Sequence, residues 1–235
     1  MSNTSQIIAA AFIALGIAVG GYLAGQGLVE ARTADRTVTV KGLAEREAPA
    51  NIAIWPIRFV QASNDLSDLV NRLEGDATKV RNFLIKQGFN PDEFSTSPPA
   101  IIDKQAQSYG NGNARFRYSA TGIITVYTDK VDTVLAANSA LAALGKEGVT
   151  INADEYQGRA EYIYTGLNDI KPAMVEEATR NAREVAQKFA EDSNSQLGKL
   201  KSARQGQFSI TNRDSNTAHV KKIRVVSTLE YYLAD

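Results

Sequence analysis

The chain has 235 residues, no cysteine, a single histidine, and 26 basic against 26 acidic residues. The absence of cysteine excludes disulfide bonds, thiolate catalysis and cysteine-ligated metals, and a formal net charge of zero argues against a broad nucleic-acid-binding surface. We therefore expect no nucleic-acid partner, and the composition alone indicates no particular chemistry.

The first predicted element is a membrane helix. The run from Ile7 to Gly25 (IIAAAFIALGIAVGGYLAG) contains no charged residue. At about 1.5 Å per helical residue it reaches roughly the 30 Å of a hydrocarbon core, and it exceeds the roughly 7 to 15 apolar residues of a cleavable signal. We expect residues 1–31 to form an N-terminal membrane anchor and residues 32–235 a soluble domain. A signal cleaved near Val29-Glu30-Ala31 is the alternative, although no basic segment precedes the run.

Small residues recur within this predicted helix. Gly16, Gly20 and Ala24 are spaced four residues apart, which places them on one stripe of a helix. Small side chains let two membrane helices approach closely, so this stripe is a candidate for helix packing. Glycine is also common in membrane helices that have no such partner, and this remains the alternative.

Strands and one helix are predicted after the anchor. Alternation at Val38 and Val40 indicates a first strand, and a turn from Glu45 to Pro49 separates it from the apolar segment 52–60. Pro56 places that second strand at an edge or bulge, because proline donates no hydrogen bond to a ladder. Apolar residues at helical spacing then predict a helix capped by Asn64.

A hairpin is predicted next. Strands from Phe94 to Lys104 and from Arg115 to Thr128 flank the polar loop Gln105 to Asn113. The loop is rich in glycine, but it joins strand to strand and lacks the helix N-terminus and lysine of a phosphate-binding loop. One face of the second strand is predicted to be formed by Phe116, Tyr118, Ala120, Gly122, Ile124 and Val126.

The remaining segments predict two helices and three strands. A smaller helix ends at Gly145, a strand covers about 156–165, a third helix begins near Asp169, and strands lie at about 200–210 and 220–233. The resulting fold class is α+β in the order β-β-α-β-β-α-β-α-β-β. The third helix is predicted to pack on a sheet through a stripe of mainly small residues: Ala178, Ala182, Val185, Ala186, Phe189 and Ala190.

Three segments together resemble the SIMPL-domain family. They are the opening strand pair (TVTVKGLAEREAPANIAI), the alanine-rich helix that leads into a Leu-Gly strand entry (AMVEEATRNAREVAQKFAEDSNSQLGKLKSAR), and the terminal alternating strand (KKIRVVSTLEYYLAD). The resemblance covers about Arg36 to Asp235. It implies an α+β domain of bacterial envelope proteins, including oxidative-stress-defence proteins and a periplasmic immunogen that forms large hollow oligomers. It implies no enzymatic activity, cofactor or catalytic residue.

The side of the membrane depends on two opposed arguments. No basic residue precedes the apolar run, whereas Arg32, Arg36 and Lys41 follow it, which favours a cytoplasmic domain. The family resemblance implies the periplasm. Because three basic residues are a weak bias, we expect a single-pass inner-membrane protein with a periplasmic soluble domain.

Residues suited to catalysis or metal binding are few. His219 is the only histidine and lies at a strand entry, where a solvated turn residue is the more frequent role. Asp154 and Glu155 lack the alternating oxygen ligands of a calcium loop. Even spacing puts Tyr156, Tyr162 and Tyr164 on one strand face, where packing under a helix is commoner than stacking on a ligand. We expect no catalytic residue, metal site or cofactor.

The predicted function is therefore assembly. We expect a non-enzymatic, membrane-anchored protein that forms a homo-oligomer and serves stress defence or envelope integrity, as the resemblance implies. A periplasmic small-molecule-binding module and a hydrolase with an unrecognised site are the alternatives. Strands 115–128 and 220–233 are long, and their edges are expected to pair with another copy unless Lys221, Lys222 and Arg224 guard a solvent edge. The candidate contact residues are Tyr109, Gly110, Asn111, Gly112 and Arg224.

Overall fold

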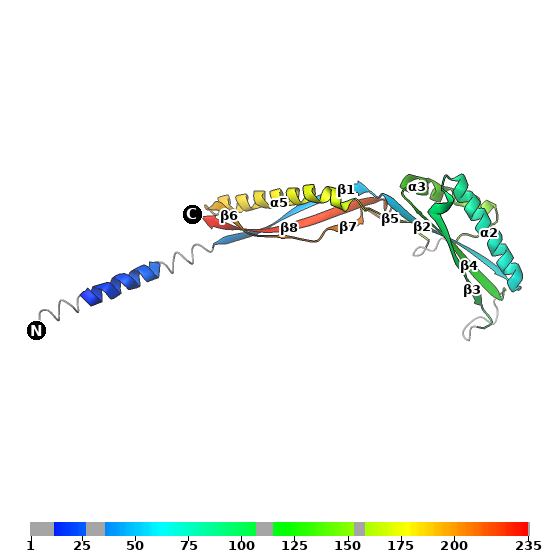
Figure 1. Ribbon diagram of the computed structural model, residues 1–235, viewed down its shortest axis with the longest axis horizontal. Helices are drawn as coiled ribbons and strands as arrows, with labels where there is room; N and C mark the ends of the chain where they lie inside the picture. The colour runs from blue at the N-terminus through cyan, green and yellow to red at the C-terminus, as the bar shows by residue number, and fades with distance from the viewer. Residues whose placement is uncertain (1–11, 27–35, 107–114, 153–157, 235) are drawn as a thin grey trace, which may run out of the picture. The chain divides into compact units, whose positions relative to one another are not determined.

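The computed structural model describes residues 12–26, 36–106, 115–152 and 158–234. The fold is α+β, with two antiparallel four-stranded sheets and helices packed on them (Figure 1). The elements after the N-terminal helix are β1 (Thr37–Pro49), β2 (Ile52–Ser63), α2 (Leu66–Lys86), the short 3-10 helix η1 (Pro91–Glu93), β3 (Phe94–Asp103), β4 (Tyr118–Thr128), α3 (Val131–Ala140), α4 (Ala142–Lys146), β5 (Glu161–Ile163), α5 (Leu167–Asp192), β6 (Gln196–Gln205), β7 (Ser209–Asn212) and β8 (Val220–Ala234).

A helix over residues 12–26 occupies part of the predicted anchor. Its large apolar side chains are all exposed, and a Cβ built at Gly16 or Gly20 would meet no atom within 4 Å. In the part of the chain that the structure describes, no helix combines the length and apolar character needed for a membrane crossing. The predicted apolar run begins at Ile7, so its first residues lie outside the described range. Packing through the small-residue stripe stays a prediction.

The chain divides into two compact units. One consists of residues 1–46, 170–209 and 224–235, and the other of residues 47–169 and 210–223.

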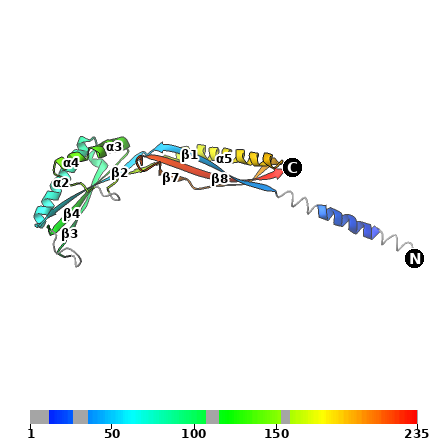
Figure 2. The same cartoon turned by 180° about the vertical axis from the view of Figure 1, so that it is seen from behind.

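In the first unit, α5 packs on a sheet with the strand order β1-β8-β6, and both views show α5 running along β1 and β8 (Figures 1 and 2). Its core contains Val40, Ala182, Ala186, Leu229 and Tyr231. Every fourth residue of α5 from Ala178 to Ala190 is an alanine with no exposed surface, as the small-residue stripe predicts.

The stripe on α5 is narrower than the sequence analysis predicts. Val185 and Phe189 are 41% and 56% exposed, so their assignment to the packing face is wrong. Each precedes a buried alanine by one residue, which turns its side chain by about 100° around the helix axis.

In the second unit, helices α2, α3 and α4 cover a sheet with the order β3-β4-β2-β5. Antiparallel pairing sets Trp55 opposite Val126 and Ile57 opposite Ile124, and all four side chains are buried in the core. The predicted inner face of β4 is confirmed at Ala120, Gly122, Ile124 and Val126. Alternation along this strand therefore identifies the core correctly.

Several boundaries differ from the prediction. The expected turn from Glu45 to Pro49 is the end of β1, and the cap of α2 is Asp65, whose Oδ1 accepts from the backbone N–H of Asp68 at 2.8 Å. Asn64, the predicted cap, instead accepts from the backbone N–H of Arg117. The predicted strand 200–210 is divided into β6 and β7, and β4 begins at Tyr118 rather than Arg115.

Strand order corrects two further predictions. β2 lies between β4 and β5 and is therefore not an edge strand. β5 pairs only with Ile52–Ile54 of β2, so the pairing between these two strands ends before Pro56. The long strands β4 and β8 are inner strands as well. Among the described strands, the ends of the two sheet orders are β1 and β6 in one and β3 and β5 in the other.

Candidate functional site

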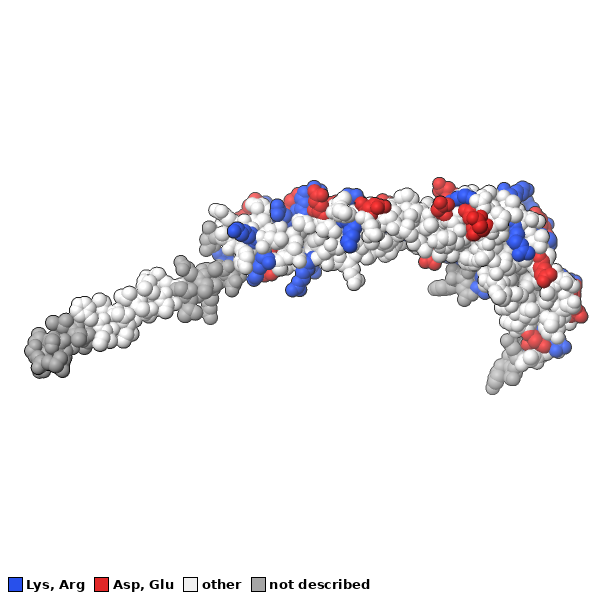
Figure 3. All heavy atoms as spheres, viewed as in Figure 1, with Lys and Arg blue, Asp and Glu red and all other residues white. Residues whose placement is uncertain are grey.

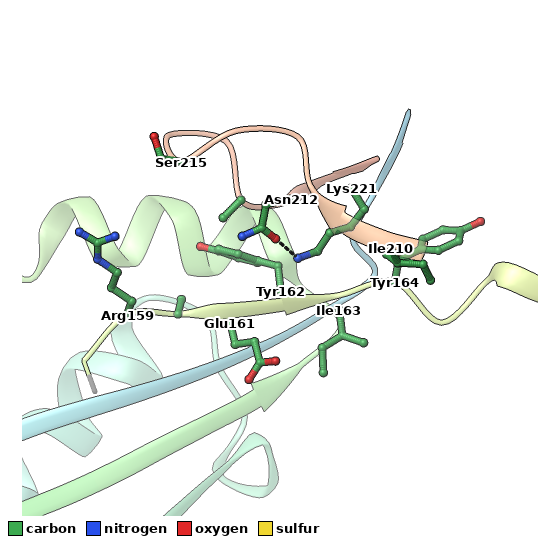
Figure 4. Close-up of a pocket in the computed structure, with 11 residues that line it drawn as sticks. Arg159, Glu161, Tyr162, Ile163, Tyr164, Ile210, Asn212, Ser215 and Lys221 are labelled. Atoms are coloured by element: carbon green, nitrogen blue, oxygen red, sulfur yellow. Dashed lines mark hydrogen bonds between the residues drawn. The ribbon is translucent and has the colours of Figure 1, made fainter. Parts of the chain in front are cut away.

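The second unit contains a cavity of about 820 Å³ between β5 and the turn that joins β7 to β8 (Figure 4). Side chains from β5 and its flanking residues line one side, and Ile210, Asn212, Ser215, Ala218 and Lys221 line the other. A second hollow of about 530 Å³ shares five of its lining residues with the first and adds His219 and residues of α3. The two hollows are therefore contiguous.

β5 forms one wall of the cavity and is fixed by its neighbour β2. Ala53 pairs with Tyr162, and Asn51 donates its backbone N–H to the carbonyl of Ile163 and accepts from the backbone N–H of Thr165. Alternation along the strand sends the side chains of Glu161 and Ile163 away from the side that Tyr162 occupies (Figure 4).

Tyr162 belongs to both the core and the cavity. Its side chain is 8% exposed, packs in the hydrophobic core of the second unit and lines both hollows. Its ring meets His219 edge-on, with centroids 6.0 Å apart. Burial raises the pKa of the Tyr162 hydroxyl, which keeps the group protonated and able to donate a hydrogen bond. The sequence prediction of a core role for this tyrosine is confirmed.

The β7–β8 turn is held in place by local hydrogen bonds. Asp214 Oδ1 accepts from the backbone N–H groups of Asn216 and Thr217, each at 2.8 Å, and Arg213 contacts Asp214 and Glu47 at 3.1 and 3.4 Å. Hydrogen bonds from the Thr217 hydroxyl and from Arg213 lower the pKa of Asp214 well below its usual range. The turn that lines this side of the cavity is therefore held in one conformation by the ionised carboxylate of Asp214.

Lys221 is the most unusual side chain of the site. It is 7% exposed, and its Nζ donates a hydrogen bond to Asn212 Oδ1 across the hairpin (Figure 4). Burial lowers the pKa of Lys221, and the charge of Glu161 opposes that shift. Within the described residues, no carboxylate forms an ion pair with this ammonium group at 4 Å or less.

The alternative in which Lys221 guards a solvent edge is wrong. The period of two along β8 puts Lys221 on the same side as Ile223 and Val225, which are buried, and Lys222 and Arg224 on the other. The alternation of side chains along β8 is visible in the sequence and identifies Lys221 as a buried charge, whereas its basic neighbours Lys222 and Arg224 lie on the other side of the strand.

The other predicted residues are distributed over the molecule. Arg224 is exposed, and its Nε lies 3.6 Å from Oε1 of Glu45 on β1. His219 is half-buried against Tyr162 and is not the solvated turn residue that the sequence predicts. The proposed contact residues Tyr109, Gly110, Asn111 and Gly112 lie outside the described residues, as do Asp154, Glu155 and Tyr156. No group of three or more metal-ligating side chains occurs in the described ranges.

Comparison with protein-family models identifies the family of the chain. The family model SIMPL, described as a protein of unknown function (DUF541), matches residues 38–225. The chain belongs to the SIMPL family. The matched region begins in β1, ends in β8 and includes the cavity residues, whereas the helix over 12–26 lies outside it. No curated protein matches the chain.

Proposed function

We propose that this SIMPL-family protein is a membrane-anchored envelope protein that acts by self-assembly and catalyses no reaction. The observation that carries the proposal is the helix over residues 12–26. It contains no charged residue and is uniformly white in Figure 3, and its large apolar side chains are 50% to 71% exposed. A contiguous apolar surface of this kind requires a partner, and lipid is the partner that covers a helix on all sides.

Open strand edges support the assembly part of the proposal. β1 has 13 residues and a single described strand neighbour, β8. The unpaired backbone groups of such an edge must be protected or paired with another chain. β3 is also an edge strand, but Pro98 and Pro99 interrupt its donors and make it a poor edge for pairing. β1 is therefore the better candidate for contact between copies.

A cellular fractionation experiment tests the anchor and its orientation. The full chain should sediment with membranes, and protease added to intact spheroplasts should digest the soluble part, because the family resemblance implies the periplasm. Replacing Leu15 and Val19 with arginine should release the protein, since charges within the apolar helix disfavour insertion. A wild-type protein in the soluble fraction would overturn the anchor, and protection in spheroplasts would reverse the orientation.

Two other functions remain as alternatives with separate tests. Small-molecule binding is favoured by the cavity beside Lys221, whose size lies within the usual range of ligand pockets. A hydrolase is tested with esterase, phosphatase and peptidase substrates, for which we expect no turnover above buffer. Hydrolysis that is lost in the His219→Ala variant would overturn the non-enzymatic proposal.

A further inference from the structure

We propose that the cavity between β5 and the β7–β8 turn binds a small carboxylate-bearing molecule whose carboxylate is held by the ammonium group of Lys221. The inference rests on the small-molecule-binding alternative and specifies its ligand. It does not depend on membrane anchoring or on assembly.

Lys221 is a buried ammonium group with few partners in the ligand-free structure. An ammonium group has three donors, and in the described structure one of them reaches the neutral oxygen of Asn212. The side chain is more than nine-tenths buried. A buried charge without a counter-ion is unfavourable, and an anion beside it removes much of that penalty. Lys221 is therefore prepared for an anionic group that enters the cavity.

The surroundings of Lys221 point the same way. Apart from Lys221, the charged residues that line the cavity are Arg159 and Glu161. Glu161 points away from the side of β5 that Tyr162 and Lys221 share (Figure 4). Its charge acts on Lys221 from a distance without forming an ion pair. An anionic ligand would therefore give Lys221 the close counter-ion that the described residues do not supply.

The remaining lining residues define the body of the ligand. Tyr162 lines the cavity together with Lys221 and Asn212 (Figure 4), and the methyl groups of Ala160 and Ala218 add apolar surface. The Tyr162 hydroxyl makes no hydrogen bond to another described residue and is a second available donor. A planar or apolar body that carries one carboxylate matches a cavity with one ammonium group, one phenol and an aromatic wall.

A carboxylate is favoured over a phosphate. Phosphate sites often place several backbone N–H groups at a helix N-terminus, whereas the cavity wall here consists of a hairpin turn and a strand that Arg159 flanks. The ammonium group of Lys221, with the Tyr162 phenol as a second donor, suits a group with two oxygens and one charge. Inorganic phosphate is the competing ligand in the test.

Ligand-observed NMR on the full-length protein in mild detergent tests the proposal. Benzoate is the probe, benzamide is its uncharged equivalent, and acetate and inorganic phosphate complete the set. We expect saturable benzoate binding that is at least tenfold tighter than benzamide binding. Lys221→Met should weaken benzoate binding at least tenfold. Lys222→Met, on the opposite side of the same strand, should leave it unchanged.

Each contrary result has a definite meaning. Absence of saturable binding by both benzoate and acetate, equal binding of benzamide, or unchanged benzoate binding in Lys221→Met would overturn the carboxylate site. Lys221-dependent binding of phosphate that is tighter than that of benzoate would overturn the ligand class. A native mass spectrum that shows a bound small molecule in both wild type and Lys221→Met would refute this site while small-molecule binding survives. Absence of any bound molecule together with absence of probe binding would refute both.

Discussion

Gly42 on β1 shows how a single residue sets the distance between a strand and a helix. A Cβ built at Gly42 would overlap the carbonyl oxygen of Ala178 and the backbone nitrogen of Ala182, and would lie 2.8 Å from the Cβ of Ala182. The strand can approach α5 this closely because the facing residues, Gly42 on β1 and Ala178 and Ala182 on α5, have very small side chains. Backbone atoms cannot move aside as the end of a flexible side chain can.

The Gly42→Ala variant should therefore be destabilised by about 1–3 kcal/mol, because overpacking forces the strand and helix apart. Urea unfolding followed by circular dichroism measures the change. Gly75→Ala is the matched control, since a Cβ at that exposed position in α2 meets nothing within 4 Å. That control should gain stability by about 1 kcal/mol from helix propensity. Equal stability of Gly42→Ala and wild type would contradict the close contact.

We expect Lys221 to lower the free energy of unfolding of the ligand-free protein. Replacing it with methionine removes a buried charge and keeps the apolar stem, and Asn212 is exposed, so water can solvate the amide that loses its partner. We expect Lys221→Met to raise the free energy of unfolding by about 1 kcal/mol or more in ligand-free protein. Thermal and urea unfolding measure this. A variant less stable than wild type would show that Lys221 stabilises the hairpin through a favourable interaction.

At the scale of elements, Glu93 links the end of α2 to β4 and α3. Its carboxylate accepts hydrogen bonds from the backbone N–H of Asn90 and from Thr128, and it forms an ion pair with Lys130 at 2.7 Å. Although burial acts to raise the pKa of Glu93, these partners lower it from 4.5 to about 2. The ionised form is therefore stabilised by the folded structure.

This shift predicts a specific dependence on pH. Because the pKa of Glu93 is lowered on folding, its contribution is complete above about pH 4.5 and is lost as the pH falls towards 2. Urea midpoints measured between pH 7 and pH 2.5 should fall less steeply in Glu93→Gln than in wild type. Thr128→Val, which removes one donor, should give an intermediate slope. Identical slopes for wild type and Glu93→Gln would show that the shift is absent.

The order of strands and helices could largely be predicted, because burial alternates cleanly where a sheet has one covered face. β4 is an example, with its buried residues at Ala120, Gly122, Ile124 and Val126. The end of β1 could not be predicted in this way. Residues 45–47 of this strand are charged and exposed, and its glutamates meet partners remote in sequence: Glu45 lies near Arg224, and Glu47 near Arg213.

The candidate site was harder to predict than the fold. The even spacing of the tyrosines predicts a core role for Tyr162, and the alternation of side chains along β8 alone indicates that Lys221 is buried. The cavity itself depends on β5 lying against the β7–β8 turn, and those segments are separated by about 50 residues in the chain. Local periodicity carries no information about such a contact.

At the scale of the whole molecule, the proposed assembly has two candidate surfaces besides the open edge of β1. One is the loop between β3 and β4, which contains the predicted contact residues, and the other is the stripe of Gly16, Gly20 and Ala24. Deleting residues 109–112 should reduce the oligomer, whereas replacing Gly16 and Gly20 with isoleucine should have the smaller effect, as judged by native mass in mild detergent. The reverse pattern would assign assembly to the membrane helix.

The most direct test of the account is the native mass of the wild-type chain. Native mass spectrometry of the full-length protein, released from mild detergent, reports the number of copies without labels or variants. We expect a single dominant closed oligomer, because symmetric closure leaves no exposed strand edge available for further growth. A monomer that persists at micromolar concentration would contradict self-assembly and leave the protein as a single-copy anchored domain.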